Sequence, residues 1–337
     1  RSTLFPYTTL FRSRTGKYLF EASGRYDGNY YFAPGKRYGF FPAFSAGWRI
    51  SEENFMKSIN WITNLKLRGS YGESGALAGS PFQYLSSYTL YGNAAIINGS
   101  AVQGVFENAE PNTSITWERA KKSNIGLEAV LWRGLLTVEA DYFFEKRDNM
   151  LFAPDISVPS EYGIGLSQVN SGSMSNKGFE LTLGSTYRIN SDWRVGFTGN
   201  LTFAKNKLLR VFETQSTYNN PNRRRTDRPL NTQFGYQALG YFQENEDVNN
   251  NGIIDPSEYA VSQPFGDLHP GDLKYQDTNK DGVISPEDQV PIGKSAVPQV
   301  MYGFAPSVSY KGFDLSVLFQ TGSRSEERRV GKECRSR

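Results

Sequence analysis

The sequence predicts an all-β fold, and within that class a transmembrane antiparallel β-barrel with long extracellular loops. First, several segments of about ten residues alternate apolar with polar side chains, which gives a strand one apolar and one wet face. A strand of that length, tilted by about 45°, spans the hydrocarbon core of a bilayer. Second, aromatic residues make up 14% of the chain and glycine occurs 33 times, as in β proteins with tight turns and aromatic girdles. Third, long and short connections alternate along the chain.

The alternation is clearest in the segment 124–147, which reads as a hairpin that turns at residues 132–134. A charge that faces lipid at mid-bilayer costs ~2–4 kcal/mol, so the charged face of this hairpin is expected to line an aqueous lumen. The apolar face of its second arm carries Leu136, Val138, Ala140, Tyr142 and Phe144, and the opposite face carries Thr137, Glu139, Asp141 and Glu145, with Phe143 as its large apolar member.

Seven further segments show the same pattern. In the first of them all the charges fall on one face, and we expect Glu21, Arg25, Glu139 and Asp141 to line the lumen. A short helical connection is expected over 51–59. The nine predicted strands are 18–27, 40–50, 65–71, 124–131, 136–145, 179–187, 193–203, 303–310 and 313–320.

The connections sort by length. Every short one falls at the same end of the strands, as in outer-membrane barrels with short periplasmic turns and long external loops. A soluble antiparallel sandwich is the alternative, although nothing in it would sort loops by length. Because a barrel in lipid must pair its edge strands, the odd strand count predicts a fragment with further strands at both ends. Short connections lie near 51–61, 132–134, 190–192 and 311–312, and long ones near 28–38, 74–116, 149–177 and 207–299, the last with a further strand near 234–242.

Composition excludes several other classes. The net charge of +3 indicates no nucleic-acid partner. The single cysteine, Cys334, excludes a disulfide scaffold, and the single histidine, His269, argues against a histidine-based metal or catalytic cluster. The chain has no apolar run long enough for a transmembrane helix.

The two ends do not continue the strand pattern. Residues 1–14 and 323–337 resemble translated sequencing-adapter sequence, and we expect them to be non-native tails. Native disordered tails are the alternative. The biological part is then residues 15–322, a partial barrel whose 207–299 connection is a long extracellular loop.

That loop contains two matches to the EF-hand calcium loop, in which acidic and amide oxygens recur at alternate positions before a glycine. Calcium takes about six to eight oxygen ligands, and the shorter final ligand Asp288 is expected to weaken the second site. Neither loop has flanking amphipathic helices, so a bound ion would have a structural role and hold the long loop in one conformation. A pair of Asx-turn loops without an ion is the alternative. The predicted Ca²⁺ ligands are Asp247, Asn249, Asn251, Ile253, Asp255 and Glu258 in the first loop and Asp277, Asn279, Asp281, Val283, Ser285 and Asp288 in the second.

Other candidate residues carry weaker signals. His269 is expected to pack within its loop because no serine or cysteine nucleophile stands beside it. The run 223–225 of three arginines is expected to be solvated, with an acidic ligand as the alternative. Loop aromatics either stack on sugar rings or peptide side chains or pack within the loops; they are Tyr30, Tyr31, Phe32, Tyr84, Tyr88 and Tyr91. No carboxylate pair has a spacing that argues for hydrolysis.

Several motifs, taken in order, resemble those of the SusC/RagA-like TonB-linked outer-membrane receptors of Bacteroidetes. The resemblance covers about residues 17–320. Its motifs are RYGFFPAFSAGWR at 37–49, SEENF at 51–55, LKLRGSYG at 65–72, TWE at 116–118, NIGL at 124–127, NKGFEL at 176–181, PGD at 270–272, DTNKDG at 277–282, PQVMYG at 298–303 and YKGFDL at 310–315.

The resemblance implies the C-terminal half of a 22-stranded barrel in the outer membrane, without the N-terminal extension, the plug domain, the first strands and the final strands. It further implies import of glycans or peptides with a SusD-like surface lipoprotein, driven by the TonB complex through an N-terminal region outside this sequence. We therefore expect a nutrient importer that needs no covalent chemistry. The rival hypotheses are a surface adhesin or structural barrel without transport, and a barrel enzyme with its site in the loops.

Overall fold

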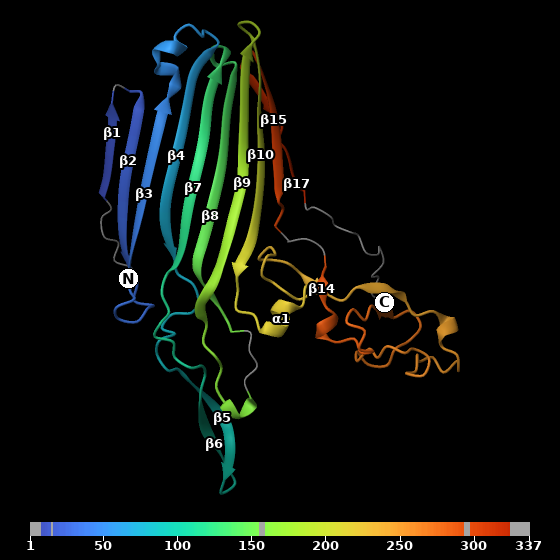
Figure 1. Ribbon diagram of the computed structural model, residues 1–337. Helices are drawn as coiled ribbons and strands as arrows, with labels where there is room; N and C mark the ends of the chain where they lie inside the picture. Colours follow the sequence, from blue (N-terminus) through green and yellow to red (C-terminus); the bar gives the residue numbers. More distant parts are fainter. Residues whose placement is uncertain (1–7, 15, 155–158, 293–296, 324–337) are drawn as a thin grey trace. The chain divides into compact units, whose positions relative to one another are not determined.

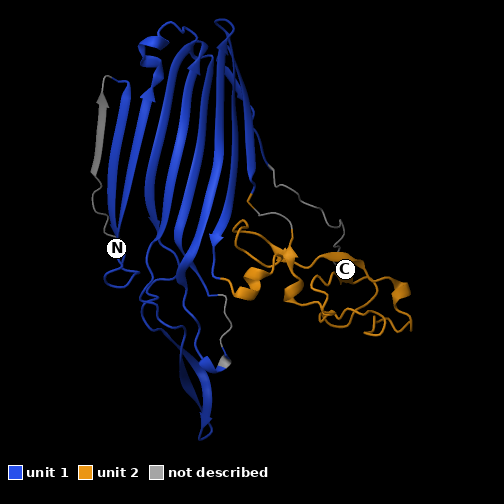
Figure 2. Cartoon of the chain, viewed as in Figure 1, with its two compact units in different colours: residues 1–212, 298–323 blue, residues 213–297, 324–337 orange. Residues whose placement is uncertain are grey.

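The computed structural model describes residues 8–14, 16–154, 159–292 and 297–323 (Figure 1). Residues 1–7 and 324–337, which include Cys334, lie outside the described residues. The chain divides into two compact units: residues 1–212 with 298–323, and residues 213–297 with 324–337 (Figure 2). No helix among the described residues is both long and apolar enough to cross a membrane.

The first unit is built on one antiparallel sheet of 11 strands. The strands follow one another across the sheet in chain order, except that β5 and β6 form a separate hairpin and β11 to β14 belong to the second unit (Figure 1). The members are β1 (Thr8–Arg14), β2 (Tyr18–Gly28), β3 (Tyr38–Arg49), β4 (Ile62–Ala76), β7 (Glu118–Leu131), β8 (Leu136–Phe152), β9 (Val169–Arg188), β10 (Trp193–Arg210), β15 (Val300–Tyr310), β16 (Phe313–Ser316) and β17 (Phe319–Ser323).

The structure confirms the predicted antiparallel sheet, and all nine predicted segments lie in it. Three details differ from expectation. The segment 313–320 is interrupted and forms β16 and β17, which both pair with β15. Strands such as β8 and β10 also run further toward the long loops than the alternation indicated, because a ladder that leaves the apolar zone can keep its backbone pairing with polar side chains on both faces. Residues 8–14 pair with β2; the expected adapter origin of both tails stays a prediction.

A third difference is the hairpin of β5 (Tyr88–Ile97) and β6 (Ser100–Glu107), which lies inside the connection expected to be a polar loop. Its turn is Asn98-Gly99, with both residues at positive φ, 52° and 76°. Asn-Gly between two strands is the favoured two-residue hairpin turn because its backbone matches the strand twist.

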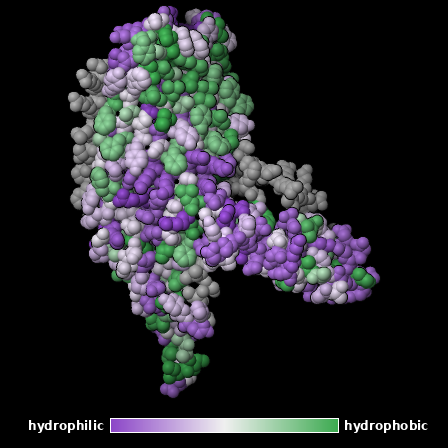
Figure 3. Space-filling model, in the orientation of Figure 1, coloured by the Kyte–Doolittle hydropathy of each residue, from purple (hydrophilic) through white to green (hydrophobic). Residues whose placement is uncertain are grey.

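From the short turns to the level of Tyr142, the register places apolar side chains on one face of the sheet. We call residues that pair with one another across neighbouring strands a row. In one row Ile125 pairs with Tyr142, Tyr142 with Phe179, and Phe179 with Phe203. These four side chains are all exposed, which is costly in water and favourable against lipid. Green residues gather in Figure 3 over the strand ends that carry the short turns, and purple residues lie nearer the long loops.

The short-turn end carries an aromatic rim. The rings of Trp61 and Trp132 stack at 5.9 Å, and the Trp193 and Tyr310 rings lie 4.3 Å apart. Tryptophan and tyrosine collect at membrane–water interfaces because each ring has an apolar body and a polar group. The short turns include the 3₁₀ helices η1 (Ile50–Glu52), η2 (Asn54–Met56) and η3 (Trp132–Gly134).

The long-loop end of the first unit has a small packed core. Phe32, Phe41, Ile115 and Trp117 are buried together, with Leu151 packed against them. The Trp117 indole donates a hydrogen bond to the Arg37 carbonyl oxygen at 3.1 Å. One further 3₁₀ helix, η4 (Ser160–Tyr162), lies in the loop that precedes β9.

The second unit consists of short elements and turns. β11 (Phe234–Gly235) pairs with β14 (Val290–Pro291), and β12 (Ala238–Tyr241) pairs with β13 (Leu273–Tyr275). Its buried side chains include Phe242, Ile254 and Ile284. The helices are α1 (Gln215–Asn219), η5 (Glu244–Glu246) and η6 (Pro286–Asp288).

Candidate functional site

The polar face of the sheet carries a cluster of ion pairs centred on Arg68. Its Nε lies 2.9 Å from Glu128 Oε1 and its Nη2 lies 2.6 Å from Asp141 Oδ2. Glu139 lies 3.7 Å from the same Nη2, and Lys66 Nζ is 3.2 Å from Glu128 Oε1. The acidic side chains outnumber the basic ones in this cluster, so this part of the polar face attracts cations and hydrogen-bond donors.

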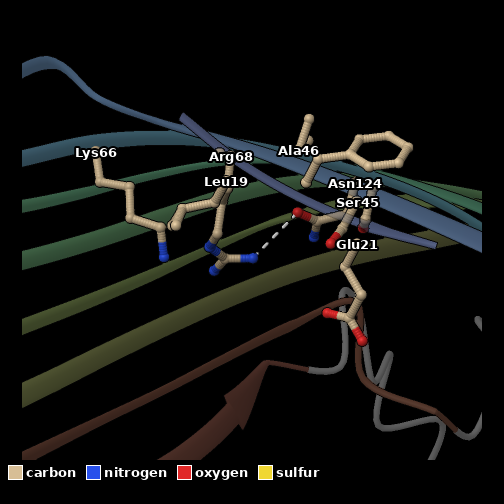
Figure 4. Close-up of a pocket in the computed structure, with 11 residues that line it drawn as sticks. Leu19, Glu21, Ser45, Ala46, Lys66, Arg68 and Asn124 are labelled. Carbon is tan, nitrogen blue, oxygen red and sulfur yellow. Dashed lines mark hydrogen bonds between the residues drawn. The ribbon is translucent and has the colours of Figure 1, made fainter. Parts of the chain in front are cut away.

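A hollow of about 250 Å³ lies next to this cluster, lined mainly by β2, β3 and β4. Figure 4 shows Glu21, Lys66 and Arg68 around the hollow, with Arg68 donating to the Asn124 side-chain oxygen at 3.4 Å. Both charge signs and an amide are therefore available to a polar solute that passes along the wall.

The register places the four predicted lumenal residues on this polar face. Glu21 pairs with Ser45, and Arg25 forms an ion pair with Asp27 at 2.7 Å. Glu139 and Asp141 belong to the Arg68 cluster. Lys66, Arg68 and Glu128 are site residues beyond those predicted from the sequence, although the alternation already places them on the polar side of their strands.

The first EF-hand-like loop folds around the oxygens expected to bind calcium. Asp247 accepts hydrogen bonds from the backbone N–H groups of Asn251 at 3.1 Å and Gly252 at 2.7 Å. Glu258 accepts from Val248 at 2.8 Å, from Asn249 at 3.0 Å and from Asp255 at 2.9 Å. The last carboxylate thus ties the beginning of the loop to its end.

The second loop repeats this arrangement. Asp277 accepts from Gly282 N–H at 2.8 Å, and Asp288 accepts from Thr278 at 2.8 Å and from Ser285 at 2.8 Å. Burial raises the pKa of the fully buried Asp288, but hydrogen bonds from the backbone of Ser285, Thr278 and Asn279 outweigh it, and the pKa lies below its ordinary value. Asp288 is therefore an anion at neutral pH.

Three carboxylates of the second loop form a group that could hold a metal ion. Oxygens of Asp277, Asp281 and Asp288 all lie within 4.8 Å of one another. Hard oxygen donors of this kind suit Ca²⁺ rather than a soft transition metal. The backbone also repeats: Asn250 and Lys280 hold φ of 56° and 62° at the same loop position, and Gly252 and Gly282 hold 81° and 85°.

The loop aromatics divide into packed and exposed groups. Phe32 is buried in the core of the first unit. Tyr30 lies edge-on to Tyr31 at 5.1 Å and 5.5 Å from Phe82. On the β5–β6 hairpin, Tyr88 and Tyr91 are exposed, so they keep free ring surface, as Tyr30 does.

The remaining candidates do not assemble a catalytic arrangement among the described residues. The backbone N–H of His269 donates to the Asp272 carboxylate at 2.8 Å, and the imidazole ring stays exposed. Arg223 lies 4.0 Å from Glu287, and Arg224 lies 5.5 Å from the centre of the Tyr218 ring. These contacts are typical of folded surface loops.

Comparisons with known proteins agree with this arrangement. Residues 7–313 match the family described as TonB dependent receptor-like, beta-barrel. TonB-dependent receptor P26 of Formosa agariphila is 32% identical over 321 residues, which cover 92% of this chain and 30% of the relative. TonB-dependent receptor SusC of Bacteroides thetaiotaomicron is 28% identical over 328 residues, or 94% of this chain and 31% of the relative. The chain thus spans about 30% of the length of the curated relatives that it matches.

A solved structure of the RagAB peptide importer in its closed-closed state has a TM-score of 0.70 to this chain. The match covers 93% of this chain and 32% of that chain at 20% sequence identity. At this identity the likeness concerns the fold, and it places the sheet among barrel walls of this type.

Proposed function

The chain belongs to the TonB-dependent receptor family of the outer membrane, and from this premise we propose that it forms part of the barrel wall of a nutrient importer. The cargo class that we propose is oligosaccharides or peptides. The receptor carries out no covalent chemistry, in keeping with a family of transporters. Further strands, in a protein as long as its relatives, would pair with the two edges of the sheet and close the barrel.

The observation that carries the proposal is the contrast between the two faces of the sheet. One face carries exposed apolar side chains such as Ile125, Tyr142 and Phe179 on the part of the sheet next to the aromatic rim. The other carries the Arg68 cluster, with Lys66, Glu128, Glu139 and Asp141. Charges on a barrel interior need water or a polar solute beside them, so this wall suits a pathway for hydrophilic cargo.

A SusD-like surface lipoprotein is the proposed partner. The hairpin β5–β6 supports this part of the proposal because Leu90, Ile96 and Val105 are exposed on it, and a two-stranded hairpin is marginally stable alone in water. Leu90 pairs with Val105, so the two form one apolar patch at the long-loop end. RagAB, to which the fold is similar, is described as a peptide importer.

Import needs an energy source, which we propose to be the TonB complex of the inner membrane. The coupling would act through an N-terminal region of the complete receptor, outside this sequence. This part rests on family membership alone.

The importer proposal is tested by uptake. A strain that lacks the complete receptor gene is supplied with a defined mixture of oligosaccharides and peptides, and depletion from the medium is followed by mass spectrometry. We expect loss of uptake for one cargo class, restored by the intact gene and abolished by a proton-motive-force uncoupler. If the deletion strain depletes both cargo classes as fast as the wild type but attaches less well to surfaces, the adhesin alternative is correct.

The partner proposal is tested by affinity purification in mild detergent. A surface lipoprotein should co-purify with the receptor. The double variant with Leu90→Asp and Val105→Asp should no longer recover this lipoprotein. Gln103→Glu is the control because it adds charge on the same side of β6 as Val105 without removing apolar surface. If all variants recover the lipoprotein equally well, the hairpin is not part of the interface.

We also propose that Ca²⁺ binds the loops 247–258 and 277–288 and stiffens the second unit. The support is the acidic group of Asp277, Asp281 and Asp288 together with the repeated backbone path of the two loops. In each loop one ion would be held by oxygens of the six residues predicted from the spacing, and its role would be structural.

A further inference from the structure

Five lysines lie on the lipid-facing side of four neighbouring strands, where the apolar rows end toward the long loops. We call this set the lysine belt. The last wholly apolar row contains Tyr142, Phe179 and Phe203, and the belt begins in the next row, where Lys177 pairs with Phe144 and with Lys205. The belt consists of Lys121 on β7, Lys146 on β8, Lys177 on β9, and Lys205 and Lys207 on β10.

The register sets like charges directly against each other in this belt. Lys177 pairs with Lys205 across β9 and β10, and Lys121 pairs with Lys146 across β7 and β8. Directly opposite residues of an antiparallel pair lie about 5 Å apart, and like charges there are destabilising. Two such pairs on adjoining strands indicate an anion that offsets the repulsion.

Among the described residues, carboxylates supply little of that negative charge to Lys121, Lys177 and Lys205. Lys146 has an ion pair with Asp148 at 3.1 Å. Glu73 on β4 pairs with Lys121 in the register, but its carboxylate is engaged by Arg119 at 3.1 Å. Among the described residues, no carboxylate lies within ion-pair distance of Lys121, Lys177 or Lys205, and all three side chains are exposed.

The height of the belt matches the outer surface of a bilayer. From Lys121 to Leu131, at the short turn, the strand covers about 33 Å at ~3.3 Å per residue. A tilt of about 45° reduces this to roughly 23 Å along the membrane normal, close to the ~25 Å apolar band of outer-membrane barrels. The Trp61 and Trp132 stack marks the opposite boundary. The belt therefore lies where the headgroups of the outer leaflet meet the barrel.

We propose that the lysine belt binds the phosphate groups of an anionic lipid of the outer leaflet. The lipid's acyl chains would pack on the apolar rows that contain Tyr142 and Phe179, and its phosphates would lie between Lys177 and Lys205. A soluble protein partner fits this place less well, because the same face is apolar immediately below and is covered by lipid. The inference rests on the outer-membrane placement of the barrel and does not depend on the cargo.

Native mass spectrometry of the complete receptor in neutral detergent tests this proposal, with diphosphorylated lipid A as the probe. The variant with Lys121→Ser, Lys177→Ser and Lys205→Ser should bind it roughly 100-fold more weakly, since each lysine beside an anionic membrane surface contributes about a factor of five. Dephosphorylated lipid A and phosphatidylethanolamine, which lack the two lipid A phosphates, should bind the intact receptor and the triple serine variant with the same low affinity.

Lys122→Ser is the matched control. Lys122 is adjacent to Lys121 but lies on the polar face, 3.9 Å from Glu145, so its loss should leave lipid binding unchanged. A triple Lys→Arg variant should retain binding, and heat-modifiable migration on a gel verifies that each barrel is folded. Equal losses with Lys122→Ser and the triple serine variant, or equally strong binding of dephosphorylated lipid A, would overturn the proposal. Competition by millimolar inorganic phosphate alone would do so too, since it would assign the site to a free anion.

Discussion

Arg68 on β4 lies 2.6 Å from Asp141 on β8, although β7 runs between these two strands. The residue between them is Gly126, which pairs with both. A Cβ atom at position 126 would lie 2.5 Å from Asp141 Oδ1 and 2.8 Å from Arg68 Cζ. The absence of a side chain on β7 is what lets the ion pair cross a whole strand.

Gly126→Ala should therefore separate Arg68 from Asp141. Asp141 is mostly buried, and its Oδ1 has no partner among the described residues even before the change. We expect a loss of about 1–2 kcal/mol in the free energy of unfolding, the usual effect of a weakened hydrogen bond to a charged group. The measurement is the temperature at which the folded band disappears on a heat-modifiability gel. Gly69→Ala is the control, because its nearest neighbour lies at 3.9 Å; an equal shift for both variants would contradict the steric explanation.

The second prediction compares two neighbouring phenylalanines on β3. Phe41 is 3% exposed and packs on Trp117 at 5.7 Å, whereas Phe40 is 54% exposed on the lipid face. Phe41→Ala should cost about 3–5 kcal/mol because it leaves a cavity in the small core at the long-loop end. Phe40→Ala should cost distinctly less in detergent. Thermal unfolding followed by tryptophan fluorescence checks this, and a larger effect at Phe40 would contradict the assignment of the two faces.

The third prediction concerns acid stability at the short-turn end. Hydrogen bonds from the Tyr18 hydroxyl, the Lys17 ammonium and the Trp48 indole lower the pKa of Glu53 to about 2 from its ordinary 4.5. Because the folded-state pKa is the lower one, this stabilisation is complete above pH 4.5 and is lost as the pH falls toward 2. Glu53→Gln should remove that part of the pH dependence. Unfolding temperatures measured between pH 6 and pH 2.5 should converge for the two proteins at the acid end; parallel curves would contradict the interpretation.

Alternation predicted the nine strands because lipid requires one apolar face on every strand that crosses it. Alternation did not predict strands in the water-exposed loops, where no face of a strand has to be apolar. Residues 88–107 lie in the water-exposed loop region, so their strands lack a regular polar face, and only the Asn98-Gly99 turn indicated the hairpin. The extensions of β8 and β10 toward the loops escaped prediction for the same reason.

The ion-pair cluster could be predicted only in part. The alternation placed Glu139 and Asp141 on the polar face, but their partner Arg68 is 73 residues from Asp141 in sequence. Which cation meets which carboxylate depends on the register of β4 against β7, and a long connection separates those strands. The calcium loops differ in this respect, because the spacing of their oxygens within twelve residues indicates a local turn without any distant partner.

The fourth prediction separates calcium binding from the folding of the loop. Asp281 accepts a hydrogen bond from Val283 N–H at 2.8 Å, and in the first loop Asn251 accepts the equivalent bond from Ile253 at 2.7 Å. An asparagine at this position is therefore compatible with the turn, and Asp281→Asn removes a charge while the turn is kept. Because ligand charge sets the affinity of such loops, we expect Ca²⁺ affinity to fall by about ten-fold, measured by calorimetry on the complete receptor.

Asp267→Asn is the matched control for this change, since Asp267 lies in the same unit outside both loops. Protease cleavage within residues 247–288 supplies a second measurement. Calcium should slow cleavage of the intact receptor and of Asp267→Asn at the same concentration, and Asp281→Asn should need more of the ion for the same protection. If millimolar calcium gives neither heat nor protection in the intact receptor, the loops are Asx-turn structures held by their own hydrogen bonds, as the Asp288 contacts to Thr278 and Ser285 would allow.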